Sequence, residues 1–118
     1  MAVSAHRTTK IIYTDMLTGG DNWLLFIKKA TSLLKKNKRG SLNYAMLHLE
    51  MRKYRSFCTC FGVSKGQELV EKFHAVLKRE MYRKETMAHQ EDEAFGLLVT
   101  YTDTAQLEAR IQKIENAL

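Results

Sequence analysis

The sequence of 118 residues contains no proline and only six glycines, so it has few of the residues that interrupt regular secondary structure. Proline removes a backbone donor and breaks helix interiors, and its absence permits long helices. No stretch approaches the ~20 consecutive apolar residues that a membrane span requires. The first residues, Met1 to Arg7, have no hydrophobic run of the kind found in secretion signals. These absences predict an intracellular protein, in the cytoplasm or the nucleus, that is not secreted.

Cysteine is also scarce, because Cys58 and Cys60 are the only two and a single residue separates them. This spacing disfavours a disulfide between them and predicts reduced thiols. A structural zinc site usually needs two pairs of ligands, and the sequence has no second pair. Two segments contain paired or closely spaced glycines, residues 18–21 and 62–66, and neither has the spacing of a phosphate-binding loop. No candidate nucleophile has both a base and an orienting carboxylate at a useful spacing. We therefore expect no metal, no cofactor and no enzymatic activity.

The caps and the apolar spacing predict an all-α fold, a small bundle of four to five helices with one long central helix. Residues 94–101 read as a further helix or a buried turn, and residues 1–20 are ambiguous. We expect one helical domain over residues 1–118, the size of a single core. The four clearer helices run from a cap at Asp21 or Asn22 to about Lys38, from Ser41 to about Cys58, from Ser64 to about His89, and from Asp103 or Thr104 to the C-terminus.

Charge is distributed unevenly along the chain. Residues 1–65 carry twelve Lys or Arg against three acids, a formal charge of +9, while residues 66–118 carry seven against ten, or −3. The sum is the net +6 of the whole chain. A division of this kind indicates an acidic partner for the first half, most simply nucleic acid, or a second copy of the chain.

Helical spacing places many of the basic residues in stripes opposite the apolar faces. On the first helix the predicted core side is Trp23, Phe26, Ile27, Ala30, Leu33 and Leu34. The stripes predict sequence-independent binding of nucleic acid, with double-stranded RNA or DNA favoured, through contacts to phosphates. The candidate nucleic-acid-binding residues are Lys28, Lys29, Lys35, Lys36, Lys38, Arg39, Arg52, Lys53, Arg55, Lys72, Arg79 and Arg83.

The same stripes have other interpretations. A run of basic residues can simply be a solvated helix face, and Glu68 and Glu80 can pair with lysines four residues further on. The alternative function is a helical protein interaction module whose basic half meets an acidic protein partner. A third interpretation places the first helix on an anionic membrane surface, but its apolar side is explained as core and no membrane partner is expected.

The last helix carries apolar residues at spacings of four, three and four, which is the pattern of a short heptad seam. Fewer than two heptads do not hold a coiled coil by themselves, so the seam docks on the chain's own bundle or on its twin. A homodimer is favoured, because two-fold dimers are the commonest oligomers. The candidate interface residues are Leu107, Ile111, Ile114 and Leu118.

Overall fold

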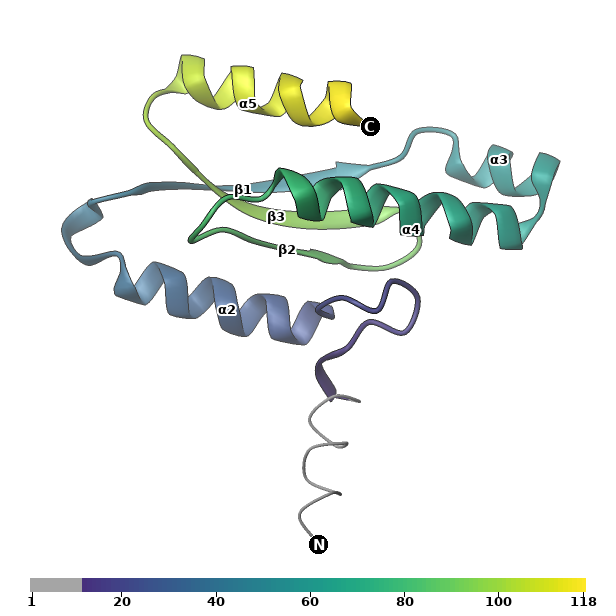
Figure 1. Ribbon diagram of the computed structural model, residues 1–118, viewed down its shortest axis with the longest axis horizontal. Helices are drawn as coiled ribbons and strands as arrows, with labels where there is room; N and C mark the ends of the chain where they lie inside the picture. Colours follow the sequence, from purple (N-terminus) through teal and green to yellow (C-terminus); the bar gives the residue numbers. More distant parts are fainter. Residues whose placement is uncertain (1–11) are drawn as a thin grey trace, which may run out of the picture.

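The computed structural model describes residues 12–118, which form an α/β fold rather than a helical bundle (Figure 1). None of the helices in this part of the chain combines the length and the apolar character that crossing a bilayer would demand. The elements are, in order, α2 (Trp23–Lys36), the short 3₁₀ helix η1 (Lys38–Gly40), β1 (Asn43–Glu50), α3 (Tyr54–Phe61), α4 (Val63–Glu80), β2 (Thr86–His89), β3 (Ala94–Tyr101) and α5 (Thr104–Ala117).

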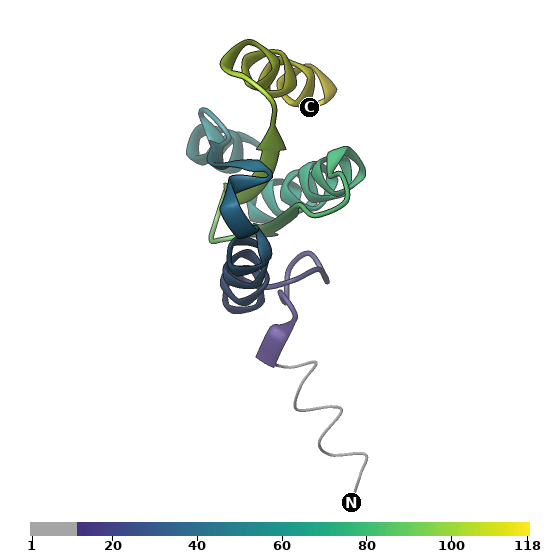
Figure 2. The same cartoon turned by 90° about the vertical axis from the view of Figure 1, so that its left-hand side faces the viewer.

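The three strands form one antiparallel sheet in the order β1-β3-β2, so β3 lies in the centre. Successive side chains of a strand point to opposite faces. One face packs against α2 through Phe26 and Ala30, and the other packs against α4 and α5 through Leu77 and Ile114. Seen along the strands in Figure 2, α2, α4 and α5 occupy three separate positions around the sheet. The sheet therefore has two apolar layers, one on each face.

The prediction of an all-α fold is wrong, and its first error concerns residues 41–58. This segment is not one helix but strand β1 followed by helix α3. Leu47 and Leu49 turn to the core while Met46 and His48 are exposed, which is the alternation of a strand. Over so few residues the same apolar positions also fit a helical face, and pairing with β3 decides in favour of the strand.

The second error concerns the long helix, which ends at Glu80 rather than near His89. Backbone at Met81 is extended and Lys84 is left-handed, with φ of 67°, so the chain turns back along the sheet. Residues 86–89 form β2, and residues 94–101 form β3, where either a helix or a buried turn was predicted. Helix α4 also begins one residue before the predicted cap Ser64, after Gly62.

Two helices follow the predicted caps closely. Asn22 caps α2, its side-chain oxygen accepting from the Leu25 amide at 3.0 Å, and Asp103 caps α5 by accepting from the Gln106 amide at 2.8 Å. The predicted apolar side of α2 is only partly right. Phe26 is fully buried, whereas Ile27 and Leu34 are 45% and 50% exposed, because α2 meets the sheet along a narrow stripe.

A buried ion pair fastens α5 to the turn before β2. Arg110 donates to both carboxylate oxygens of Glu85, at 2.9 and 2.7 Å, and to the Glu80 carbonyl at 2.8 Å. The two charged side chains are 2% and 0% exposed. Glu85 also accepts from the amides of Tyr82 and Thr100, each at 2.7 Å. One carboxylate thus connects α5, the α4–β2 turn and the centre of the sheet.

Burial alone would raise the pKa of Glu85, but the hydrogen bonds from Arg110, Thr100 and Tyr82 outweigh it and the net pKa is lowered. A carboxyl whose folded pKa lies below its unfolded pKa stabilises the fold above the unfolded value. That stabilisation is lost as the pH falls through the lowered pKa. The ion pair therefore contributes at neutral pH and fails on acidification.

We expect Arg110→Met to lower the free energy of unfolding at neutral pH by about 3–5 kcal/mol, because it leaves a buried carboxylate without its partner. Urea unfolding followed by circular dichroism measures the change. Lys113→Met is the matched control, since the Lys113 side chain is 58% exposed and its Nζ lies 5.7 Å from the same Tyr82 ring that Arg110 covers. Equal losses in the two variants would contradict the assignment.

Candidate functional site

A pocket of about 400 Å³ lies where α3, the start of α4, the β2–β3 hairpin and the loop before α2 meet. Its volume falls in the usual range for small-molecule sites, roughly 300–1,000 Å³. Two lining residues are apolar and the others bring hydroxyl, thiol, amide, guanidinium and carboxylate groups to one place. The lining residues are Leu17, Tyr54, Arg55, Cys58, Val63, Gln67, Asp92 and Glu93.

Two glycines shape the helical wall of this pocket. Gly62 separates α3 from α4 with φ of 93°, a backbone conformation that side chains disfavour, and so allows the sharp reversal. Gly66 is buried in the first turns of α4. A Cβ atom on Gly66 would lie 2.4 Å from the Cys58 sulfur and 2.9 Å from the Tyr54 hydroxyl oxygen. The bare glycine is what allows these two side chains to lie against α4.

Tyr54 is the most perturbed titratable group of the pocket. Burial, a hydrogen bond with Cys58, and the negative charges of Asp92 and Glu93 raise its pKa to about 12. The phenol therefore stays protonated near neutral pH and can donate a hydrogen bond to a ligand. A strongly shifted pKa in a cleft with identified charge partners is typical of functional sites.

The hairpin that carries the two carboxylates is tightly fixed. Gln90 and Ala94 close it with hydrogen bonds of 2.8 Å, the Gln90 amide to the Ala94 carbonyl and the Ala94 amide to the Glu91 carbonyl. At its tip Asp92 has φ of 47°, a conformation that favours glycine. The His89 Nε2 lies 2.8 Å from the Asp92 carbonyl oxygen. The tip thus holds Asp92 and Glu93 in place beside α3.

His89 also anchors the loop that carries Leu17. Its Nδ1 lies 3.2 Å from both carboxylate oxygens of Asp15. Asp15 in turn accepts from the amide and hydroxyl of Thr18, at 2.9 and 2.7 Å. Burial would raise the pKa of Asp15, but these hydrogen bonds and the contact with His89 lower it. The loop, the hairpin and therefore two walls of the pocket form one connected unit.

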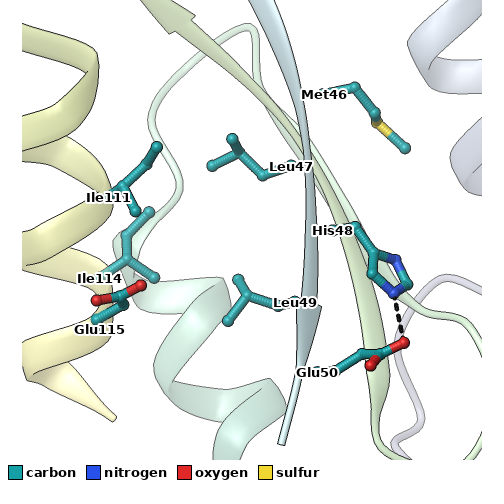
Figure 3. A pocket seen from close by; sticks show the side chains of 8 residues that line it. All are labelled: Met46, Leu47, His48, Leu49, Glu50, Ile111, Ile114 and Glu115. Carbon is teal, nitrogen blue, oxygen red and sulfur yellow. Dashed lines mark hydrogen bonds and ion pairs between the residues drawn. The ribbon is translucent and has the colours of Figure 1, made fainter.

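A second cavity, of about 320 Å³, runs between β1 and α5. Figure 3 shows Leu47 and Leu49 pointing toward Ile111 and Ile114, while Met46 and His48 lie on the other side of the strand. On that side the Glu50 carboxylate is 2.9 Å from the His48 Nε2. Side chains facing α5 are mainly apolar, so this cavity lacks the converging polar groups of the first.

The predicted nucleic-acid-binding residues do not form one surface. Stripes on α2 and α4 lie on helices that cover opposite faces of the sheet, and Lys29 is paired with Asp21 at 2.5 Å. Of all these residues only Arg55 lines the 400 Å³ pocket. Lys28, Lys29, Lys35 and Lys36 are in α2, Lys38 and Arg39 in η1, Arg52 and Lys53 between β1 and α3, Arg55 in α3, Lys72 and Arg79 in α4, and Arg83 between α4 and β2.

The heptad seam of α5 docks on the chain's own core. Ile114 is 1% exposed, Leu107 and Leu118 pack beside it, and Ile111 lines the groove next to β1. Association of two copies through these residues stays a prediction.

Sequence reasoning missed most of the pocket. It placed Tyr54 inside a longer helix, from Ser41 to about Cys58, and named neither Tyr54 nor Gln67 as a candidate site residue. The run Glu91, Asp92 and Glu93 follows the predicted end of the long helix near His89, and none of the three is a predicted site residue. An acidic run directly before an apolar, β-branched segment was the available signal of a hairpin tip.

Residues 12–118 match the family described as "Diguanylate cyclase, GGDEF domain". The fold defines the class of protein, an α/β domain with a polar pocket at the tip of a hairpin. The family match covers nearly the whole chain. The chain belongs to the diguanylate cyclase GGDEF-domain family. No match was found among curated protein sequences.

Solved structures agree with the family at the level of the fold. The coiled coil and GGDEF domain of DgcB from Caulobacter crescentus, in complex with c-di-GMP, has a TM-score of 0.82 at 15% identity, over 96% of this chain and 59% of that chain. The structure of Vibrio cholerae LapD, bound to c-di-GMP, has a TM-score of 0.80 at 16% identity, and the match covers 99% of this chain and 28% of that chain. The structure of Pseudomonas aeruginosa SiaD, in complex with its activator SiaC, has a TM-score of 0.78 at 14% identity, and the match covers 98% of this chain and 49% of that chain.

Family membership corrects four predictions. The expected nucleic-acid function is wrong, as is the alternative of a protein interaction module, because the family is one of cyclic di-GMP signalling. Nucleic acid and an acidic protein are accordingly withdrawn as partners. The expectation that the chain is not an enzyme is wrong for its family, which is named for an enzyme. The chain spans about three fifths of the DgcB structures that it matches.

The pocket wall can be tested at Gly66. Alanine is favoured over glycine in a helix by about 1 kcal/mol, yet here the new methyl group displaces Tyr54 and Cys58, at a cost of about 1–3 kcal/mol. We expect Gly66→Ala to lower the free energy of unfolding, and Cys58→Ala in the same chain to restore part of it. Urea unfolding of both variants and of Cys58→Ala alone measures this. A Gly66→Ala protein more stable than the wild type would show that the wall is open.

Proposed function

We propose that this chain works in cyclic di-GMP signalling and binds a guanine nucleotide in the pocket between α3, α4 and the β2–β3 hairpin. The observation that carries the proposal is the gathering of complementary groups in one pocket of a diguanylate cyclase-family domain. Relatives whose structures contain c-di-GMP support the class of ligand. Nucleotides of this class are intracellular, so we propose an intracellular site of action, and relatives from bacteria give no support for a nucleus.

The pocket offers a separate group for each part of a nucleotide. Leu17 and Val63 provide apolar surface for the planar base. The Gln67 amide and the protonated Tyr54 hydroxyl provide donors and an acceptor for its polar edge. Arg55, exposed at the mouth, can donate two parallel hydrogen bonds to a phosphate. This division of roles is why we assign the nucleotide to this pocket.

The hairpin also resembles the pentapeptide that the family name spells. Read as one-letter codes, the name is Gly-Gly-Asp-Glu-Phe, which does not occur in this chain. Residues 91–95, Glu-Asp-Glu-Ala-Phe, keep an acid at the third place and the phenylalanine at the fifth. Asp92 takes the left-handed backbone that a glycine would favour. We infer that this hairpin replaces the family's pentapeptide.

A second stretch, Gly19 to Trp23, keeps the first three letters of the name. It lies elsewhere, because Asp21 is paired with Lys29 and the Trp23 ring packs against Gly96. A Cβ at Gly20 would lie 2.4 Å from the His74 Nε2. These contacts hold the segment against the core and away from the pocket of Tyr54, so we favour the hairpin.

Nucleoside triphosphates are commonly bound together with Mg²⁺, which takes carboxylate ligands and substrate phosphates. The residues present do not fit such a metal. Within residues 12–118 no three His, Cys, Asp or Glu side chains converge as ligands. Glu50 is paired with His48, and its neighbour across the ladder is Ala94, whose side chain has no oxygen that could bind a metal. We derive no step that passes through a metal.

The proposal predicts binding of guanine nucleotides that depends on Arg55. Arg55→Ala removes a charge-assisted contact worth about 1.5–3 kcal/mol, so we expect the affinity for c-di-GMP to fall by about tenfold or more. Isothermal titration calorimetry measures the affinity, and chromatography of samples incubated with GTP measures any turnover separately. The matched control is Arg83→Ala, an exposed arginine outside the pocket, which should bind like the wild type.

Two outcomes would contradict the proposal. One is a wild-type protein that binds neither c-di-GMP nor GTP. The other is equal weakening by Arg55→Ala and Arg83→Ala, which would indicate a general effect of positive charge rather than a contact in this pocket.

A further inference from the structure

His89, the last residue of β2, joins two segments that lie far apart in the sequence. Its Nδ1 is 3.2 Å from both carboxylate oxygens of Asp15, and its Nε2 is 2.8 Å from the Asp92 carbonyl oxygen. The side chain is 6% exposed, and the Phe95 ring packs against it at 60°, with ring centroids 5.4 Å apart. A single buried ring thus connects the loop before α2 with the tip of the β2–β3 hairpin.

The chemistry of these two partners decides how many protons His89 must carry. A neutral imidazole has one N–H donor and one acceptor nitrogen, whereas the imidazolium has two donors. A backbone carbonyl only accepts, and so does an ionised carboxylate. Although burial would raise the pKa of Asp15, hydrogen bonds from Thr18 and the contact with His89 lower it, so the carboxylate is ionised near neutral pH. Both contacts are therefore hydrogen bonds only while His89 holds two protons.

Other titratable groups around His89 come from three segments and do not replace its charge. Within residues 12–118, His89 is the one basic side chain within hydrogen-bond distance of Asp15. His74 is buried, and burial first and then the charge of Lys78 lower its pKa, so it stays neutral near neutral pH. The charged and titratable groups nearby are Asp15 and Asp21 before α2, His74 and Lys78 in α4, and Asp92 and Glu93 in the hairpin.

Loss of one proton from His89 breaks the contact with the hairpin rather than the contact with the loop. Hydrogen bonds to a charged carboxylate are stronger than those to a neutral carbonyl, so the remaining proton stays on Nδ1 beside Asp15. Nε2 and the Asp92 carbonyl oxygen are then two acceptors facing each other at 2.8 Å, and they repel. The loop keeps the bonds from Thr18 to Asp15, whereas Asp92 has a disfavoured φ of 47° and is free to move.

We propose that His89 is a positioning residue that acts as an imidazolium: with two protons it fastens the hairpin tip to the Asp15 loop, and its deprotonation releases the tip. The tip carries Asp92 and Glu93, which line the pocket of about 400 Å³. The pocket wall is therefore fixed at low pH and loosens as the pH rises through the range in which histidine titrates. This inference goes beyond the proposed function, because it does not depend on which ligand the pocket takes.

Nitrogen-15 NMR spectra of the imidazole rings test the proposal on the wild-type protein without any ligand. The His89 signals are assigned from their loss in His89→Gln. We expect protons on both His89 nitrogens at ~pH 5 and on Nδ1 alone at ~pH 8. The Asp92 carbonyl carbon and the amides of residues 91–94 should shift with the same midpoint. A ring with the same number of protons at both pH values, or a tip whose signals do not follow the proton, would overturn the proposal.

Substitutions of the two buried histidines provide a second test with the same spectra. His89→Arg keeps its charge and several donors at every pH, so its tip signals should stay in place between ~pH 5 and ~pH 8. His89→Gln is neutral and carries its donors on one nitrogen, so it cannot bridge both partners and its tip should be released at both values.

His74→Gln is the matched control, because it removes a buried histidine near the same loop, and its tip should respond to pH like the wild type. A wild-type response in His89→Arg, or a lost response in His74→Gln, would contradict the role of His89. If the buried position does not accept arginine, the titration of the wild type decides by itself.

Discussion

Strand β3 is the constraint on which the rest of the structure depends. It pairs with β1 along eight residues and with β2 along four, and its first six residues are buried. A strand buried on both faces must be covered by helices on both sides, and α2 on one face and α4 with α5 on the other meet this need. Gly96 completes the fit, because a Cβ there would lie 2.5 Å from the Trp23 ring.

The same strand positions the pocket. Its N-terminal end continues into the hairpin that carries Asp92 and Glu93, and the β1 strand beside it leads directly into α3 with Tyr54 and Arg55. Residues from four separate segments therefore converge at one end of the sheet. The core holds the strands in register, and the contact of His89 with Asp15 and Asp92 fixes the loops around them. The stability of the core and the geometry of the site are thus coupled through β3.

Two groups of charged residues, the buried ion pair and the pocket, differ in how well their charges are balanced. In the core, the charges of Glu85 and Arg110 neutralise each other, and this ion pair stabilises the fold. The pocket leaves Asp92 and Glu93 opposed by a single arginine, so its own side chains do not balance its charge. The lysines of α2 and α4 face solvent on opposite sides of the sheet and belong to neither group.

The sequence by itself determined the helix caps at Asn22 and Asp103 and the apolar face that buries Phe26. These features depend on neighbours within a few residues along the chain. Only the tertiary structure decided that residues 43–50 and 94–101 are strands, because their short apolar runs fit either periodicity until they pair across 43 or more intervening residues. It alone also brought Gln67 to Asp92 and Glu93. Contacts between distant segments have no local signal, and they define both the sheet and the pocket.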